Sequence, residues 1–168
     1  MSTKSELQAL LERVKAATGP DRMIDAAVQH AVFPQQRVLL DPGKVFGPGE
    51  KRPPTYGVLS DIDILEWWGV ADIEREGIAG LFEAPPYTAS LDAITALIER
   101  ELPGWWCDFR LGTIPPHLPK GRAVLWNSDR RTRESINGCV GDAATPALAL
   151  IAAFLSAMIA QMGDEHDE

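Results

Sequence analysis

The sequence predicts an α+β fold, in which helices cover both faces of a small, mainly antiparallel sheet. Two segments carry this prediction. Residues 86–110 have the pattern of a capped amphipathic helix, a Pro-Gly stop and an aromatic-rich strand. Residues 145–162 have the length and apolar composition of a second, more deeply buried helix. Both segments fit a domain built of packed helix and sheet layers around one core.

Length and composition limit the kinds of protein that this chain can be. The chain has 168 residues, of which 45% are hydrophobic and 24% are charged, and this composition is ordinary for one globular domain. Its net charge of −8 argues against nucleic acid as a partner, since non-specific affinity for a polyanion comes from Lys and Arg. The N-terminus has no apolar targeting segment, and a cytoplasmic location is therefore expected.

The first two elements are predicted to be helices. Residues 5–18 place leucines at helical spacing, and Gly19-Pro20 then breaks the chain. Thr18 is the expected cap of the second helix, with Pro20 at its first position and Val32 near its end. We expect residues 1–19 to be a helical extension, residues 20–162 a single α+β domain, and residues 163–168 an acidic tail.

The segment from residue 41 to residue 84 is predicted to be an irregular insert. It follows a short strand at 37–40 and begins with a loop rich in Pro and Gly, from Asp41 to Thr55. Ser60-Asp-Ile-Asp63 resembles a capping box before a short helix through Trp67-Trp68. Residues 70–82 fit either a strand pair or a loop excursion.

The segment 86–110 carries the clearest local signals. Thr88 or Ser90 caps a helix whose apolar stripe ends at Leu102, and Pro103-Gly104 stops it. The following strand, 105–111, alternates between a face predicted to be buried and a second face. The buried face holds Trp105, Cys107, Phe109 and Leu111, and the second face holds Trp106, Asp108 and Arg110.

A second strand, at 122–127, is predicted to pair antiparallel with the first. Thr145-Pro146 then opens the last helix. Residues 143–162 carry no charge and are long enough to cross a bilayer, but acidic flanks and an all-round apolar surface favour a buried core helix.

Signatures of catalysis and metal binding are absent from the sequence. There is no GxSxG, no Walker loop and no GxGxxG, and His30, His117 and His166 share no ligand spacing. Cys107 and Cys139 have no CxxC partner and are expected to be free thiols, with a disulfide only if the fold brings them together. We therefore expect no enzyme activity, no cofactor and no metal.

Two features are candidates for ligand binding. Arg130, Arg131 and Arg133 lie in one polar loop and form a local anion site, with Arg110 nearby if the strand pair forms. The alternative is a solvated turn with acidic counter-charges. Trp106 on the second face of its strand is either covered by a helix layer or offers a flat surface to a base or a partner chain.

Tyr87–Ala93 running into Leu102–Trp105, together with Ala144–Leu150, resembles the phage ABA sandwich domain family of small bacteriophage and prophage proteins. The resemblance extends from Asp21 to about Gln161. It implies a three-layer α/β/α sandwich and carries over no catalytic residue. The chain departs from the family pattern in its extra N-terminal helix and in the expanded segment 41–83.

These observations leave three functional hypotheses. The leading one is a non-enzymatic phage accessory protein in the cytoplasm of an infected bacterium, which binds a small anionic or nucleotide-like ligand such as a host immune signal. The second is a structural or protein-interaction component of the virion or of its assembly. A homo-oligomer is expected for the protein in general. The third is a hydrolase of a phosphodiester-like bond, for which His117 and Asp108 are the candidate groups.

Overall fold

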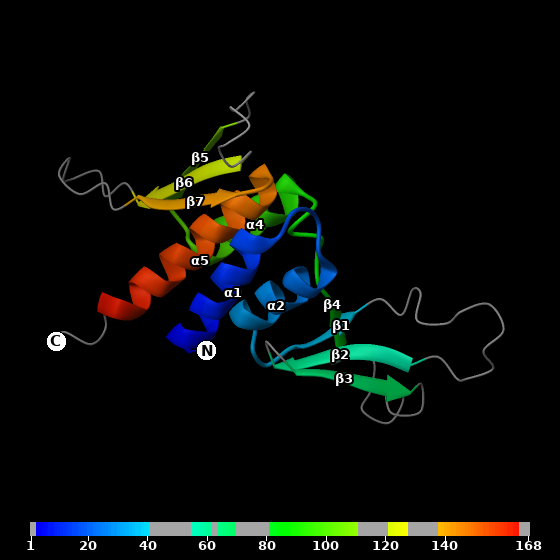
Figure 1. Ribbon diagram of the computed structural model, residues 1–168. Helices are drawn as coiled ribbons and strands as arrows, with labels where there is room; N and C mark the ends of the chain where they lie inside the picture. The colour runs from blue at the N-terminus through cyan, green and yellow to red at the C-terminus, as the bar shows by residue number, and fades with distance from the viewer. Residues whose placement is uncertain are drawn as a thin grey trace. The chain divides into compact units, whose positions relative to one another are not determined.

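The computed structural model describes residues 3–40, 55–61, 64–69, 81–110, 121–127 and 138–164, which hold four helices and two sheets (Figure 1). The predicted α+β class is confirmed. The chain divides into two compact units, one formed by Arg22–Pro85 and the other by Thr3–Asp21 with Pro86–Glu168. These boundaries differ from the expected ones at residues 19 and 162, and each unit is described by itself.

The first unit consists of one described helix and a mixed sheet. Helix α2 (Arg22–Val32) packs against β1 (Arg37–Leu40) and β2 (Thr55–Asp61). The strand order is β3-β2-β1-β4, with β3 at Ile64–Gly69 and β4 at Leu81–Glu83. β1 runs antiparallel to β2 and parallel to β4.

The prediction of a short helix through Trp67-Trp68 is wrong. β2 and β3 pair as antiparallel strands, with Tyr56 opposite Trp68 and Gly57 opposite Trp67. A capping-box pattern is a local signal, whereas aromatic and β-branched side chains favour strands when a partner strand is present. Within residues 41–84, expected to be irregular, the described residues form β2, β3 and β4.

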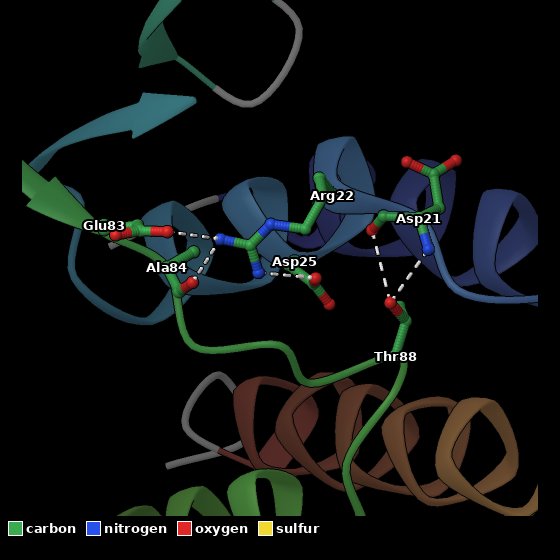
Figure 2. A network of polar contacts seen from close by, with 6 residues as sticks. All are labelled: Asp21, Arg22, Asp25, Glu83, Ala84 and Thr88. Atoms are coloured by element: carbon green, nitrogen blue, oxygen red, sulfur yellow. Dashed lines mark hydrogen bonds and ion pairs between the residues drawn. The ribbon is translucent and has the colours of Figure 1, made fainter. Parts of the chain in front are cut away.

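Arg22 ties the first turn of α2 to the end of β4. Figure 2 shows its guanidinium between the two elements. Nη1 lies 3.0 Å from Asp25 Oδ2, and Nη2 donates to the Ala84 carbonyl at 2.7 Å. Nη2 also lies 3.3 Å from the exposed Glu83 carboxylate. Because the Asp25 side chain is only 1% exposed, Arg22 supplies charge to a carboxylate that water does not reach.

The second unit is a three-stranded sheet with helices on one side. β5 (Trp105–Arg110), β6 (Gly121–Asn127) and β7 (Cys139–Ala143) form an antiparallel sheet in that order. Helix α5 (Pro146–Asp164) packs along this sheet, and α1 (Lys4–Ala16) and α4 (Leu91–Glu101) pack against α5. In Figure 1 these three helices lie below the sheet.

Local signals place the helix ends of this unit as the sequence predicts. The Ser90 hydroxyl accepts the Ala93 N–H at 3.2 Å, and the Thr145 hydroxyl accepts the Leu148 N–H at 3.2 Å. Leu102 is the buried C-cap of α4, and Gly104 follows with a φ of +84°, a conformation that favours glycine. Thr3 and Glu6 form an unforeseen capping box on α1.

The predicted start of the second helix at Pro20 is wrong, because α2 begins at Arg22. The backbone of Asp21 is engaged elsewhere (Figure 2). Its N–H donates to Thr88 Oγ1 at 2.9 Å, and the Thr88 hydroxyl donates to its carbonyl at 3.3 Å. The candidate cap Thr88 therefore holds residue 21, distant in sequence, rather than capping α4.

Helix α5 lies directly on the sheet. Every residue from Ala147 to Leu155 is buried. A Cβ atom at Gly141 would overlap the backbone of Ala149 and Ala153, and one at Gly121 would overlap the Thr145 carbonyl. By length and composition α5 is the one described helix that could cross a membrane, and 56% of that window is buried inside the protein.

Replacing Gly141 by alanine is expected to lower the free energy of unfolding by at least ~2 kcal/mol, because the added methyl group meets rigid backbone. Urea unfolding of Gly141→Ala beside the wild type measures this loss. Gly19→Ala is the matched control: its new Cβ meets nothing within 4 Å, and a change within about 0.5 kcal/mol is expected. Equal stabilities of the two variants would show that α5 does not touch the sheet at Gly141.

Arg22→Ala is expected to cost about 1–3 kcal/mol, because it removes a cationic partner of the buried Asp25 and a donor to the Ala84 carbonyl. Thermal and urea unfolding measure the loss. Lys15→Ala is the control: Lys15 pairs with Glu12 on the surface of α1, and an exposed pair contributes ~0–1 kcal/mol. A loss of unfolding free energy no larger than that of the control would show that the Arg22 contacts do not stabilise the first unit.

Candidate functional site

The candidate site is the face of the β5–β6–β7 sheet that points away from α5. Strand alternation produces it, since successive side chains point to opposite faces. On β6 the side chains alternate in burial: Ala123 and Leu125 are buried, whereas Arg122 is exposed. On β7 the same period buries Gly141 and exposes Asp142.

On β5, Trp105, Cys107 and Phe109 are half-buried, and Trp106 and Asp108 are exposed. The predicted alternation is therefore seen from Trp105 to Phe109, with the predicted buried face half-buried. Trp106 is 57% exposed, an unusual degree for the largest apolar side chain. We use the term open face for the positions on the Trp106 side of the three strands.

The registers arrange the open face in rows. Trp106 on β5 lies opposite Trp126 on β6, so their Cβ atoms are about 5 Å apart. The next row along the strands joins Asp108, Val124 and Val140, and the third joins Arg110, Arg122 and Asp142. The two tryptophans and the two valines of this face thus lie next to a row made of charged residues.

Charge on the open face is balanced. The Arg122 Nε lies 3.7 Å from Asp142 Oδ1, and both side chains are about half exposed. Such a pair in water is weak, so Arg122 can exchange its partner at little cost. With Arg110 and Asp108 at neighbouring positions, two cationic and two anionic residues occupy the face. This surface can stack and hydrogen-bond with a ligand, but it is not a strong anion trap.

Two of the five predicted ligand-binding residues fall on this sheet. Trp106 lies on the open face, and Arg110 occupies the last position of β5, in register with Arg122. The predicted loop residues Arg130, Arg131 and Arg133 lie outside the described residues. Trp126 and Val140 were missed, although the period of two at 122–126 and 140–142 was the signal that could have found them.

The catalytic candidates do not assemble among the described residues. Asp108 is exposed on β5, and His117 lies outside the described part of the chain. His30 is buried on α2, where its Nδ1 lies 3.2 Å from the Gln36 carbonyl oxygen. Gln29 donates to the Gln36 side chain at 2.6 Å, so these polar groups hold the turn between α2 and β1. In the described ranges, no three His, Cys, Asp or Glu residues are grouped as a metal site would need.

The two cysteines flank Leu125 on neighbouring strands. Cys107 is opposite Leu125 on one side and Cys139 on the other, so their Cα atoms are about 10 Å apart. A disulfide needs less than roughly 7 Å, and both thiols are free. Burial raises the pKa of the Cys107 thiol, as do the Glu99 and Asp108 carboxylates, and burial raises the pKa of the Cys139 thiol.

No family model, no curated protein and no solved structure matches this chain.

The cysteines are expected to react with Ellman's reagent more slowly in the folded protein than in urea at pH 7.5. A raised pKa leaves less thiolate at that pH, and thiolate is the attacking species. After mild oxidation the mass spectrum is expected to show no disulfide within the chain. Cys107→Ser and Cys139→Ser assign the two rates, and a thiol that reacts faster in the folded protein would contradict this reading.

Proposed function

We propose that this chain is a non-enzymatic binding protein whose open face takes a small nucleotide-like ligand. The observation that carries the proposal is Trp106, 57% exposed and in register with Trp126 on a sheet face without a described helix against it. A planar apolar surface of this kind stacks on a base, and each stacked base contributes about 1–3 kcal/mol.

The size of the open face supports a small ligand over a protein. Three strands at about 4.8 Å spacing and six residues at about 3.4 Å give a flat area of roughly 300 Å². A standard protein interface covers about 800 Å² on each partner. The open face is therefore suited to a nucleotide or a molecule of similar size.

The resemblance to the phage ABA sandwich domain family extends this proposal. On that basis the protein is a phage accessory protein that acts in the infected cell, and the sequestering of a host immune signal is a role that fits a binding protein without catalytic groups. The three-layer sandwich implied by the resemblance stays a prediction. It competes with the proposal, since a second helical layer would cover Trp106.

Self-association is the second candidate function, and the observation that favours it is Val140. This side chain is 43% exposed, and Val124 lies beside it in the same row. Burial of exposed aliphatic side chains against a protein partner removes their apolar surface from water and is favourable. Sedimentation velocity over a hundredfold range of concentration distinguishes the candidates, because only self-association produces a dimer that Val140→Asp abolishes.

Trp106→Ala is expected to weaken nucleotide binding about tenfold, because it removes one stacking surface. Calorimetric titration of the wild type with a panel of nucleotides and cyclic nucleotides identifies the ligand, and the variant is then compared. Trp106→Phe is the matched control, since it retains a ring and is expected to retain most of the affinity. A folded wild type that binds no member of the panel would refute the proposal.

A further inference from the structure

We infer that the first unit is an inserted domain that unfolds and refolds on its own while the second unit stays folded. The first basis is the order of the chain. The second unit consists of Thr3–Asp21 and Pro86–Glu168, so the first unit, Arg22–Pro85, interrupts it as one continuous segment. Insertion of a domain is tolerated where the two ends of the interrupted chain lie close together.

The second unit closes its own chain at the point of insertion. The Asp21 N–H donates to Thr88 Oγ1 at 2.9 Å, and the Thr88 hydroxyl donates to the Asp21 carbonyl at 3.3 Å (Figure 2). Thr88 is only 2% exposed, so water competes little for these bonds. Both residues belong to the second unit. The chain ends on either side of the insertion therefore stay together when the first unit opens.

The first unit closes its own ends independently. Arg22, its first residue, donates from Nη2 to the Ala84 carbonyl at 2.7 Å, one residue before the end of the unit. Its Nη1 pairs with the buried Asp25 at 3.0 Å, and β1 pairs with β4. All of these contacts lie within one continuous segment, and contiguous segments of this kind commonly open as one cooperative unit.

Size and core composition make the first unit the one that opens more readily. A domain of about 60 residues buries a smaller share of its surface than a larger one and is marginally stable. The described helices differ in the same direction. The buried apolar side chains of α2 are Ile24, Val28 and alanines 26, 27 and 31. Those of α5 include Leu148, Leu150, Ile151, Phe154 and Leu155, which remove more apolar surface from water.

Hydrogen exchange of the full-length protein, followed by NMR at low urea concentrations, tests the inference. The amides of α2 and β1 are expected to share one opening constant and one urea dependence. This opening constant is expected to exceed that of α5 at least about tenfold, because the global transition is not needed for it. A single opening constant and a single urea dependence shared by α2 and α5 would overturn the inference.

Two variants make the test reciprocal. Arg22→Ala is expected to accelerate exchange in α2 and β1 about tenfold and to leave α5 within about twofold. Gly141→Ala is expected to do the reverse, with at least about tenfold faster exchange in α5 and β7 and unchanged exchange in α2. Equal acceleration in both units by either variant would overturn the inference. If Arg22→Ala unfolds the first unit outright, retained protection of α5 supports the inference and its loss contradicts it.

Thr88→Val tests the closure of the second unit, because it keeps the shape of the side chain and removes the two hydrogen bonds to Asp21. The Asp21 amide is expected to exchange about tenfold faster, while the amides of α2 keep their wild-type rates. An unchanged rate at Asp21, or an equal acceleration throughout α2, would show that this contact does not close the second unit separately.

Discussion

The second unit depends on the direct contact between α5 and the backbone of the sheet. Gly141 leaves no room for a side chain beneath Ala149 and Ala153, and Gly121 leaves none beneath Thr145. The small residues let the helix approach closely, so its larger side chains fill the space around this contact. Leu148, Ile151 and Phe154 are fully buried as a result. This close approach leaves little tolerance for substitution, because a single methyl group added at Gly141 meets tightly packed backbone atoms.

The same contact assigns different roles to the two faces of one sheet. Because successive side chains alternate, a strand that presents Ala123 and Leu125 to α5 must present Arg122, Val124 and Trp126 to the other side. The inner face is therefore committed to packing, and the exposed side chains of β5 and β7 lie on the outer face. Adjacent tryptophans illustrate the division: Trp105 is half-buried on the inner side, and Trp106 on the outer side is 57% exposed.

The sequence was informative where local rules decide the structure. Ser90, Leu102 and Gly104 act within one helix and its end, and Thr145 caps α5, so these boundaries were predictable. Prediction failed where a contact outside the local helix pattern decides, made either by the next strand or by a residue far along the chain. The pairing of β2 with β3 overrides the capping pattern at 60–63, and Thr88 engages Asp21 across 67 residues. For the site, alternation identified Trp106 in advance. The period of two along 122–126 also places Trp126 on this face, but only the strand register sets it opposite Trp106.

The charges of the open face bear on how an acidic protein would hold the proposed ligand. A chain of net charge −8 repels anions at long range, and salt weakens this repulsion beyond about 10 Å. Binding must therefore come from short-range terms, and stacking on tryptophan is one that acts with any base. The loose Arg122–Asp142 pair offsets one charge of each sign in the far row of the face. Simple phosphates are therefore expected to be poor competitors of the proposed ligand for the open face.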